Sequence, residues 1–298
     1  MRLIEPKVEI IPQGEGIDGV YQQIEKAGRT CYKSEDKITP TSAKEFVGMM
    51  IANGHTAMLE HGTVYLKVPL EKWNEDPFVW NIYIPQESPW VSMFCEGNFV
   101  YVTTNYRFII ENLRDWMMRD YWCEPTEFHP KRISVRFTCD RGVSHELVRH
   151  RVFSFAQEST RFCNYSKDKF GNELTFIIPS WLNLNPGTYI LERDSQGRRA
   201  IEGDGYYYDL SDGVEEEPAF LYSLLQAERS YFTMLDLGWK PQQARQVLPN
   251  ALKTEVVMSG FVEDWKHFFE LRCAPNAHPD MQLLANQLKE ELKRQSIM

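Results

Sequence analysis

The sequence predicts an α+β fold, mostly helical, with a small antiparallel or mixed sheet in a single domain over residues 1–298. Three observations lead to this prediction. A chain of 298 residues with 43% hydrophobic content can bury one large core. Strand-like and helix-like segments do not alternate as they do in a doubly wound protein. The chain also lacks Gly-x-Gly-x-x-Gly, the fingerprint of a Rossmann nucleotide site.

The first clear element is a helix over residues 41–53. Ser42 and Glu45 have the spacing of a capping box, and Asn53-Gly54 is a stop signal. The apolar positions at helical spacing between these signals are Phe46, Met49 and Met50.

The middle of the chain predicts strands. Residues 132–139 alternate between two kinds of side chain, which is typical of a strand with one buried face. The apolar positions are Ile133, Val135, Phe137 and Cys139, and the polar positions are Arg132, Ser134, Arg136 and Thr138. Shorter strands are expected at 64–68, 99–104 and 174–178, and helices at 105–118 and, after a turn at 140–142, at 144–153.

The C-terminal part predicts three helices. Residues 185–217 are rich in Gly, Asp, Arg and Tyr without a clear period, so we expect a surface excursion there. Helices are predicted at 218–237, 262–272 and 281–294. Phe261, just before the second of these helices, and Trp265 and Phe268 within it are at helical spacing, which should hold the last residue of this helix, Arg272, in place.

Charge and composition argue against several classes of protein. A net charge of -9 disfavours general binding of a nucleic-acid polymer. No apolar run approaches the roughly 20 residues that cross a membrane, and residues 1–6 lack the apolar core of a signal peptide. The six cysteines contain no Cys-x-x-Cys pair and are expected to be reduced thiols. We therefore expect a cytoplasmic protein.

Residues 144–161 form the densest polar cluster, with three arginines, two histidines and two carboxylates. Arginine forks suit phosphate and uracil-type oxygens, because the guanidinium offers paired donors and keeps its charge. By itself, the cluster is also compatible with a solvated helix face.

A zinc motif is nearly present in this segment. His145-Glu146 and His150 resemble His-Glu-x-x-His, but the second histidine comes one residue late. Five helical residues rotate by about 140°, so the two imidazoles would diverge. We expect no metal site.

The motif Arg149-His150-Arg151, followed by seven residues and Ser159, resembles the signature of flavin-dependent thymidylate synthases, and Arg161 also fits. Further elements that resemble this family occur in its order: Arg29-x-Cys31-Tyr32, Gly54-His55 with Glu60-His61, Ala244-Arg245-x-Val247-Leu248-Pro249, and Phe268-Phe269-x-Leu271-Arg272.

The resemblance implies reductive methylation of dUMP to dTMP by a homotetramer that uses FAD, NADPH and methylenetetrahydrofolate. Arg272 would be the catalytic group beside the uracil, favouring its N3-deprotonated form. The implied dUMP site comprises Glu146, Arg149, Gln157, Glu158, Ser159, Thr160, Arg161, Arg245 and Arg272, with some residues acting on a neighbouring subunit. The implied FAD site comprises His55, Arg149, His150, Arg151, Gln157, His267 and His278.

The chain departs from the family pattern at several positions. Ala57 stands where Ser is frequent, and Phe261 and Glu263 stand where Asn and Arg often meet the adenine end of FAD. Glu146 stands where Gln is common, and His267 replaces an Asn. The chain is also long for the family, which implies insertions near 70–131 and 185–217.

Two other classes of function stay open from the sequence. One is a metal-dependent hydrolase built on His55, His61, His145 and His150. The other is a nucleotide-binding protein that has no catalytic activity. Bound zinc without flavin would indicate the first, and a colourless protein that takes up no FAD would count against the enzyme.

Overall fold

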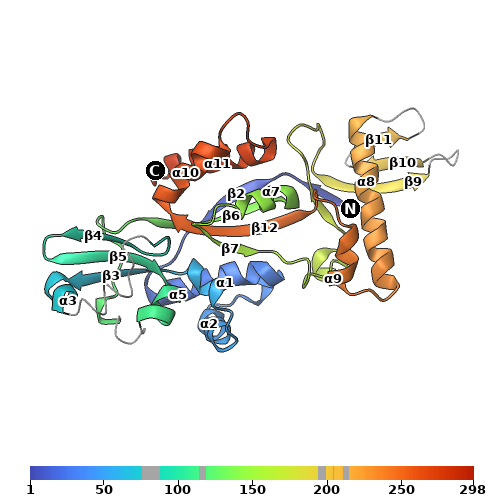
Figure 1. The fold of residues 1–298 in the computed structure, drawn as a ribbon. Coiled ribbons are helices and arrows are strands. Elements are labelled where there is room, and N and C mark those ends of the chain that lie inside the picture. Colours follow the sequence, from blue (N-terminus) through green and yellow to red (C-terminus); the bar gives the residue numbers. More distant parts are fainter. Residues whose placement is uncertain (76–87, 114–118, 194–198, 204, 211–214) are drawn as a thin grey trace.

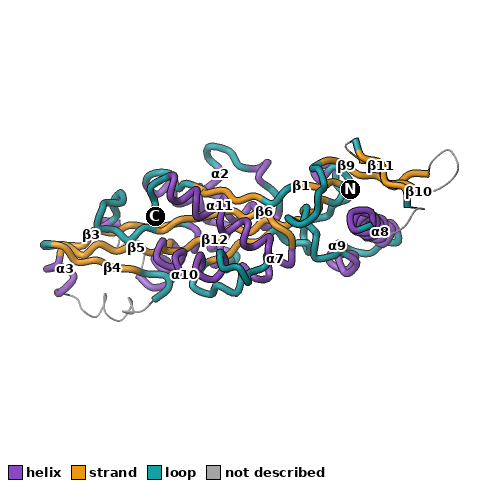
Figure 2. The backbone as a smooth tube through the Cα atoms, turned by 90° about the horizontal axis from the view of Figure 1, so that it is seen from above, coloured by secondary structure: helices purple, strands orange, loops and turns teal. Residues whose placement is uncertain are grey.

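The computed structural model describes residues 1–75, 88–113, 119–193, 199–203, 205–210 and 215–298. Within these ranges the strands form three small sheets, which follow one another along an elongated molecule (Figures 1 and 2). Two sheets are antiparallel, and the third is mixed because β1 (Arg2–Ile4) runs parallel to β8 (Thr175–Ile177) and antiparallel to β9 (Gly187–Arg193). The predicted α+β class is confirmed.

The central sheet has the strand order β2-β6-β12-β7. Its members are β2 (Lys7–Ile11), β6 (Arg132–Asp140), β12 (Lys253–Phe261) and β7 (Ser154–Gln157), all antiparallel to their neighbours. The strand predicted at 132–139 is therefore confirmed. The sequence analysis did not predict β12, whose residues 256–261 are all buried and show no alternation.

Helices cover both faces of the central sheet (Figure 1). On one face lie α10 (Val262–Arg272) and α11 (Pro279–Arg294), whose Trp265, Phe268 and Leu284 pack with the apolar side of β6 in one buried cluster. On the other face lies α1 (Gly16–Tyr32), and Ala27 packs there with β7 and β12. The polar side of β6 is largely buried as well, since Arg132, Ser134 and Thr138 are buried and Arg136 is half-buried.

Helix α1 was not predicted, and it contains glycines, which are poor helix formers. Gly28 is required by packing: a Cβ at this position would lie 2.6 Å from the ring of Phe46 in α2 (Ser42–Ala52). The predicted capping box of α2 does not form, since Ser42 donates instead to Glu25. Met49 of the predicted apolar stripe is exposed.

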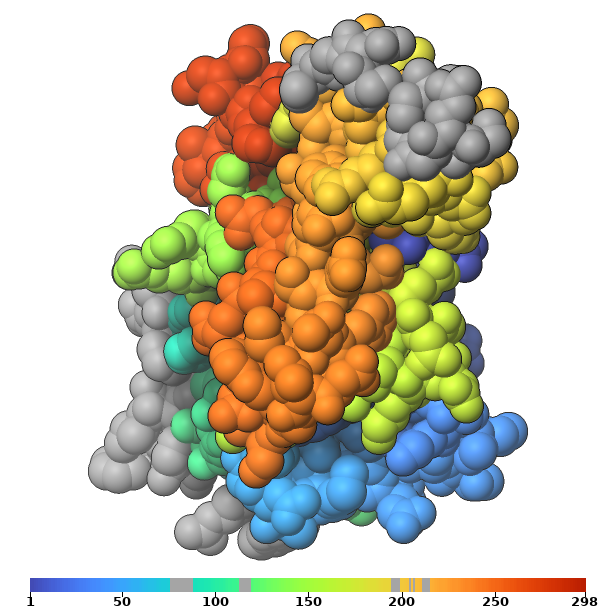
Figure 3. Space-filling view, turned by 90° about the vertical axis from the view of Figure 1, so that its right-hand side faces the viewer, coloured from blue at the N-terminus to red at the C-terminus, as the bar shows by residue number. Residues whose placement is uncertain are grey.

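The other two sheets flank the centre. The order β3-β5-β4 holds for β3 (Thr63–Pro69), β5 (Phe99–Asn105) and β4 (Ser92–Glu96). The mixed sheet continues through β9, β10 (Arg199–Gly203) and β11 (Tyr206–Asp209), so the predicted excursion at 185–217 contains strands. Tyr189 and Ile201 pack with α8 (Glu216–Asp236), which runs along this end of the molecule (Figure 3).

The remaining elements are short. They are η1 (Glu35–Lys37), η2 (Thr56–His61), α3 (Leu70–Glu75), α5 (Tyr106–Phe108), η3 (Ile109–Leu113), η4 (Arg119–Tyr121), α7 (Arg141–Leu147), η5 (Asp168–Phe170), α9 (Pro241–Ala244) and η6 (Arg245–Val247). The helix predicted at 105–118 is thus a single turn followed by a π-helix, and residues 114–118 lie outside the described part of the chain. Across the described residues, no helix combines the length and apolar character needed to cross a membrane.

Gly260 in β12 allows the ring of Phe153 to approach the sheet. A Cβ at this position would lie 2.2 Å from that ring, whereas a Cβ at Gly48 in α2 would meet nothing within 4 Å. We expect Gly260→Ala to lower the free energy of unfolding by about 1–3 kcal/mol through overpacking. The matched variant Gly48→Ala should raise it by roughly 0.5–1 kcal/mol. Urea denaturation of both variants tests this, and equal effects would contradict the proposed close approach.

Candidate functional site

The polar segment 144–161 lies at the end of α7 and along β7. The helix predicted at 144–153 is wrong in its bounds, because α7 begins and ends earlier. The Asp140 side chain accepts a hydrogen bond from the Val143 backbone and caps the helix, which therefore begins at Arg141, three residues before the predicted start. Turns carry Arg149, His150 and Arg151 from the end of α7 into β7.

Arg272, the last residue of α10, meets this segment. Its Nη1 donates to Glu146 Oε2 at 2.6 Å and its Nε donates to His150 Nε2 at 2.8 Å. Its Nη2 donates to the Glu146 carbonyl at 3.2 Å. Residues more than 120 positions apart are thereby joined, and the fork of Arg272 is held in one orientation.

His150 is a neutral acceptor in this arrangement. Its ring is buried and packs edge-on against Phe268, with 5.0 Å between the ring centroids. Burial, the Arg272 cation and His267 lower the pKa of His150 from 6.5 to about 4. Because Arg272 donates to Nε2, the proton of the neutral ring must be on Nδ1.

A second buried histidine, His61, is also held neutral. Burial and the Arg132 cation lower its pKa from 6.5 to about 3. A folded-state pKa below the unfolded value means that the unfolded chain binds the proton first as the pH falls. The stability that these two neutral rings contribute is therefore complete above pH 6.5, and it declines as the pH falls toward 4 for His150 and 3 for His61.

We expect the free energy of unfolding to fall by about 1.4 kcal/mol per pH unit for each of the two histidines below pH 6.5. Urea titrations at several pH values measure this slope. His61→Asn should remove the contribution of one bound proton, about 1.4 kcal/mol per pH unit, from the slope between pH 6 and roughly pH 4. An unchanged slope in that variant would show that His61 is not the titrating group.

A second polar group forms where η6 meets the chain after β7. Arg245 Nη1 donates to Thr160 Oγ1 at 3.3 Å, and Arg161 Nε donates to Gln242 Oε1 at 3.3 Å. The Ser159 hydroxyl accepts from the backbone of Arg161 at 3.3 Å. Two guanidinium groups and two hydroxyls thus gather here, which suits an anion such as a phosphate.

Gln157 and Glu158 lie between these two groups and point to different surroundings. Gln157 donates to Ser144 Oγ at 2.9 Å and to Thr254 Oγ1 at 3.4 Å. Glu158 is only 2% exposed, and its carboxylate accepts from Lys253 and Tyr165. A direct contact between this carboxylate and a ligand would require these bonds to open.

Arg149 and Arg151 are exposed. Among the described residues, neither side chain has a hydrogen bond or an ion pair. Two cations without a protein counter-ion are available for an anionic ligand, although the chain as a whole is acidic.

The three outlying histidines are dispersed. His55 lies exposed at the start of η2, and His278 lies exposed at the start of α11 with its ring 5.7 Å from that of Trp181. His267 is exposed on α10 and contacts Glu270 at 3.3 Å. Within the described ranges, no group of three His, Cys, Asp or Glu side chains is arranged to hold a metal ion.

The structure thus brings together Glu146, His150 and Arg272 in one group and Ser159, Thr160, Arg161 and Arg245 in another. Four polar residues that bond to predicted site residues were not predicted: Gln242 bonds to Arg161, Lys253 to Glu158, and Ser144 and Thr254 to Gln157. The only sequence signal for Lys253 was a charge shortly before the apolar residues Val256, Val257 and Met258. The folded chain was needed to place that charge beside Glu158.

Residues 110–296 match the protein family described as thymidylate synthase complementing protein. A flavin-dependent thymidylate synthase from Corynebacterium efficiens is 25% identical over 285 residues, which cover 93% of this chain and 77% of that protein.

Two solved structures are more distant. The UMP/dUMP methylase PolB from Streptomyces cacaoi, bound with 5-Br UMP, is 16% identical with a TM-score of 0.42, covering 99% of this chain and 92% of that one. Thymidylate synthase X from Helicobacter pylori, with FAD and dUMP, is 15% identical with a TM-score of 0.38, covering 96% and 92%.

Proposed function

The chain belongs to the thymidylate synthase complementing protein family, and from this premise we propose that it is a flavin-dependent thymidylate synthase that methylates dUMP to dTMP. The resemblance noted in the sequence is confirmed by the family match, which covers residues 110–296. The observation that carries the proposal is the fixed guanidinium of Arg272 beside the motif Arg149-His150-Arg151.

FAD is the cofactor that the family implies, and the residues present fit it. Arg149 and Arg151 offer exposed cations for the flavin diphosphate, and His150 offers a neutral ring beside them. The other proposed contacts are His55, Gln157, His267 and His278. Bound FAD, reduced by NADPH, would supply the hydride that completes the methyl group.

For dUMP, the two groups of side chains suit two ends of one nucleotide. Arg245, Thr160, Arg161 and Ser159 form the group that suits the phosphate. Arg272 would face the uracil and stabilise negative charge that develops on the ring oxygens and N3. Glu146 and His150 orient the Arg272 fork, so that dUMP would meet a guanidinium already in position.

The finer features of the proposal follow the family. We propose NADPH and methylenetetrahydrofolate as co-substrates and a homotetramer in which neighbouring subunits complete each site. The dispersal of His55, His267 and His278 over separate elements supports a shared site. One domain with insertions near 70–131 and 185–217 and a cytoplasmic location complete the proposal. The six free cysteines fit a reducing compartment.

The experiment that tests the function is an assay of the purified protein with dUMP, NADPH and methylenetetrahydrofolate. We expect dTMP formation, tritium release from dUMP labelled at C5, and the visible absorbance of bound flavin. A colourless protein that takes up no added FAD and forms no dTMP would contradict the proposal. Stoichiometric zinc in such a protein would instead favour a metal-dependent hydrolase.

A further inference from the structure

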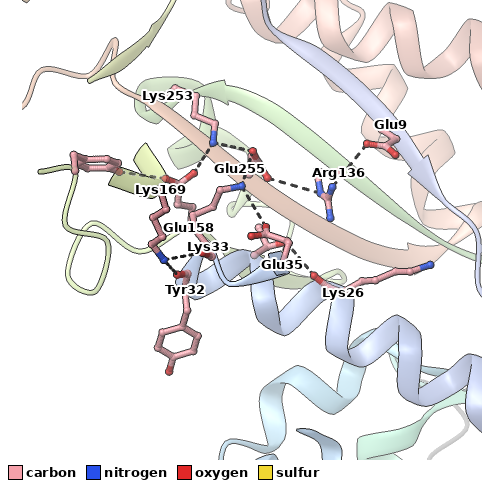
Figure 4. Close-up of polar contacts among 12 residues, drawn as sticks. Glu9, Lys26, Tyr32, Lys33, Glu35, Arg136, Glu158, Lys169, Lys253 and Glu255 are labelled. Atoms are coloured by element: carbon pink, nitrogen blue, oxygen red, sulfur yellow. Dashed lines mark hydrogen bonds and ion pairs between the residues drawn. The ribbon is translucent and has the colours of Figure 1, made fainter. Parts of the chain in front are cut away.

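A cluster of buried and half-buried charges surrounds Glu158, the residue that precedes Ser159 (Figure 4). Lys253 Nζ lies 2.8 Å from Glu158 Oε2 and 2.8 Å from Glu255 Oε1. Lys33 Nζ lies 2.9 Å from the same oxygen of Glu255. We call Lys253, Glu158, Glu255 and Lys33 the Lys253 cluster.

Glu158 is the most buried member of the Lys253 cluster, and Lys253 is its only cation within ion-pair distance among the described residues. Its other carboxylate oxygen accepts from the Tyr165 hydroxyl at 3.3 Å. A buried carboxylate that loses its only cation must move to water or take up a proton, because its charge is then uncompensated. Lys253 therefore decides whether the Glu158 side chain can stay inside.

The charges of the cluster are mutually stabilised. Burial alone would raise the pKa of Glu255, but Lys253 and Lys33 lower it to about 2. Burial would lower the pKa of Lys253, but Glu158 and Glu255 raise it above its usual value. Lys253 and Glu255 are thus both charged at neutral pH and hold as an ion pair.

Glu158 directly precedes, in the chain, the residues that we propose to bind the phosphate of dUMP. The Glu158 backbone donates to the Glu255 carbonyl at 2.9 Å, and the Ser159 backbone donates to the Cys31 carbonyl at 3.1 Å. The next residue, Thr160, accepts from Arg245. Outward movement of Glu158 would pull on these bonds and displace the turn that carries Ser159, Thr160 and Arg161.

We propose that Lys253 is a positioning residue for the nucleotide: its ion pair with Glu158 anchors the turn at residues 158–161, so that the turn and Arg245 present their polar groups to dUMP. The inference rests on the proposed function of this site. It assigns Glu158 an anchoring role within the chain, in place of the direct dUMP contact that the sequence resemblance implied.

Lys33 provides a matched control within the same cluster. It is a lysine of similar burial, since its side chain is 21% exposed against 14% for Lys253. It pairs with Glu255 and Glu35, and its amino group makes no ion pair with Glu158. Removing Lys33 disturbs the charge balance of the cluster while leaving the Lys253–Glu158 pair in place.

The experiment compares FAD-loaded wild type, Lys253→Met, Lys253→Arg and Lys33→Met by calorimetric titration with dUMP and by steady-state kinetics. We expect Lys253→Met to raise the Kd and the KM for dUMP by about tenfold or more, because the anchor of the turn is lost. Its kcat at saturating dUMP, its FAD content and its KM for NADPH should stay within about twofold of wild type.

Lys253→Arg should restore the Kd to within about threefold of wild type, because it keeps a cation beside Glu158. Lys33→Met should lower the Tm while its Kd for dUMP stays within about twofold. Equal Kd values for the two Met variants, or a loss in Lys253→Met that falls on kcat alone, would overturn the proposal. Wild type that binds no dUMP would refute the proposed function, and the inference with it.

If Lys253→Met does not fold, Glu158→Gln tests from the other partner whether this ion pair anchors the turn. Its amide keeps an oxygen for the Tyr165 hydroxyl and places no unpaired charge inside the protein. We expect its Kd for dUMP to rise by about threefold or more with kcat unchanged, because the ion pair that anchors the turn is gone. A Kd equal to that of wild type would overturn the proposal.

Discussion

Arg272→Ala should abolish dTMP formation while FAD remains bound, with a loss of at least about 100-fold in kcat. The Arg272 guanidinium is held by Glu146 and His150 and is the cation that we place beside the uracil. Its removal deletes the charge that stabilises the developing anion, and it leaves Glu146 without its ion pair. Single-turnover dTMP formation and the flavin absorbance of the same sample measure the two quantities.

The control for this prediction is Arg294→Ala. Arg294 also ends a helix, α11, but it is exposed, and its one ion pair among the described residues is with Glu291. We expect its activity to stay within about twofold of wild type, because a surface ion pair contributes little. Full activity in Arg272→Ala would refute the catalytic assignment, and a loss fully explained by released FAD would move Arg272 to a cofactor-binding role.

Arg149→Ala should weaken the binding of both FAD and dUMP, each by about tenfold or more, since a charge-assisted hydrogen bond contributes roughly 1.5–3 kcal/mol. Arg149 lies exposed between α7 and β7, and no partner among the described residues neutralises its charge. Equilibrium titrations of the apoprotein with FAD and of the loaded protein with dUMP provide the two affinities.

Arg229→Ala is the matched control for Arg149. Arg229 is an exposed arginine on α8, outside both groups of the candidate site. Both affinities should be unchanged in this variant, so that a general effect of charge can be separated from a local one. Unchanged affinity for both ligands in Arg149→Ala would refute the shared contact, and a loss for one ligand alone would assign Arg149 to that ligand.

The sequence determined the elements whose signals are local. The alternation over 132–139 predicted β6, and the stripe of Phe261, Trp265 and Phe268 predicted α10, whose predicted bounds of 262–272 are confirmed. The helices of the C-terminal part start within about two residues of their predicted positions, as is usual for helix ends. Periodicity within one element is enough for such predictions, because it depends only on which face is buried.

Only the tertiary structure decided which surfaces meet. Helix α1 packs against β7 and β12 on one face of the central sheet, and the need for Gly28 in this helix is explained by the ring of Phe46 in α2. Likewise, α7 begins earlier than predicted because the Asp140 side chain caps it.

For the candidate site, too, the sequence identified individual residues, whereas the folded structure showed their contacts. The sequence alone pointed to Arg272 and to the motif Arg149-His150-Arg151. It could not show that Arg272 bonds to Glu146 and His150, or that Lys253 anchors the buried Glu158. These contacts join residues about 95 to 126 positions apart. Their strength depends on burial and orientation, which arise only when the packed core brings distant segments together.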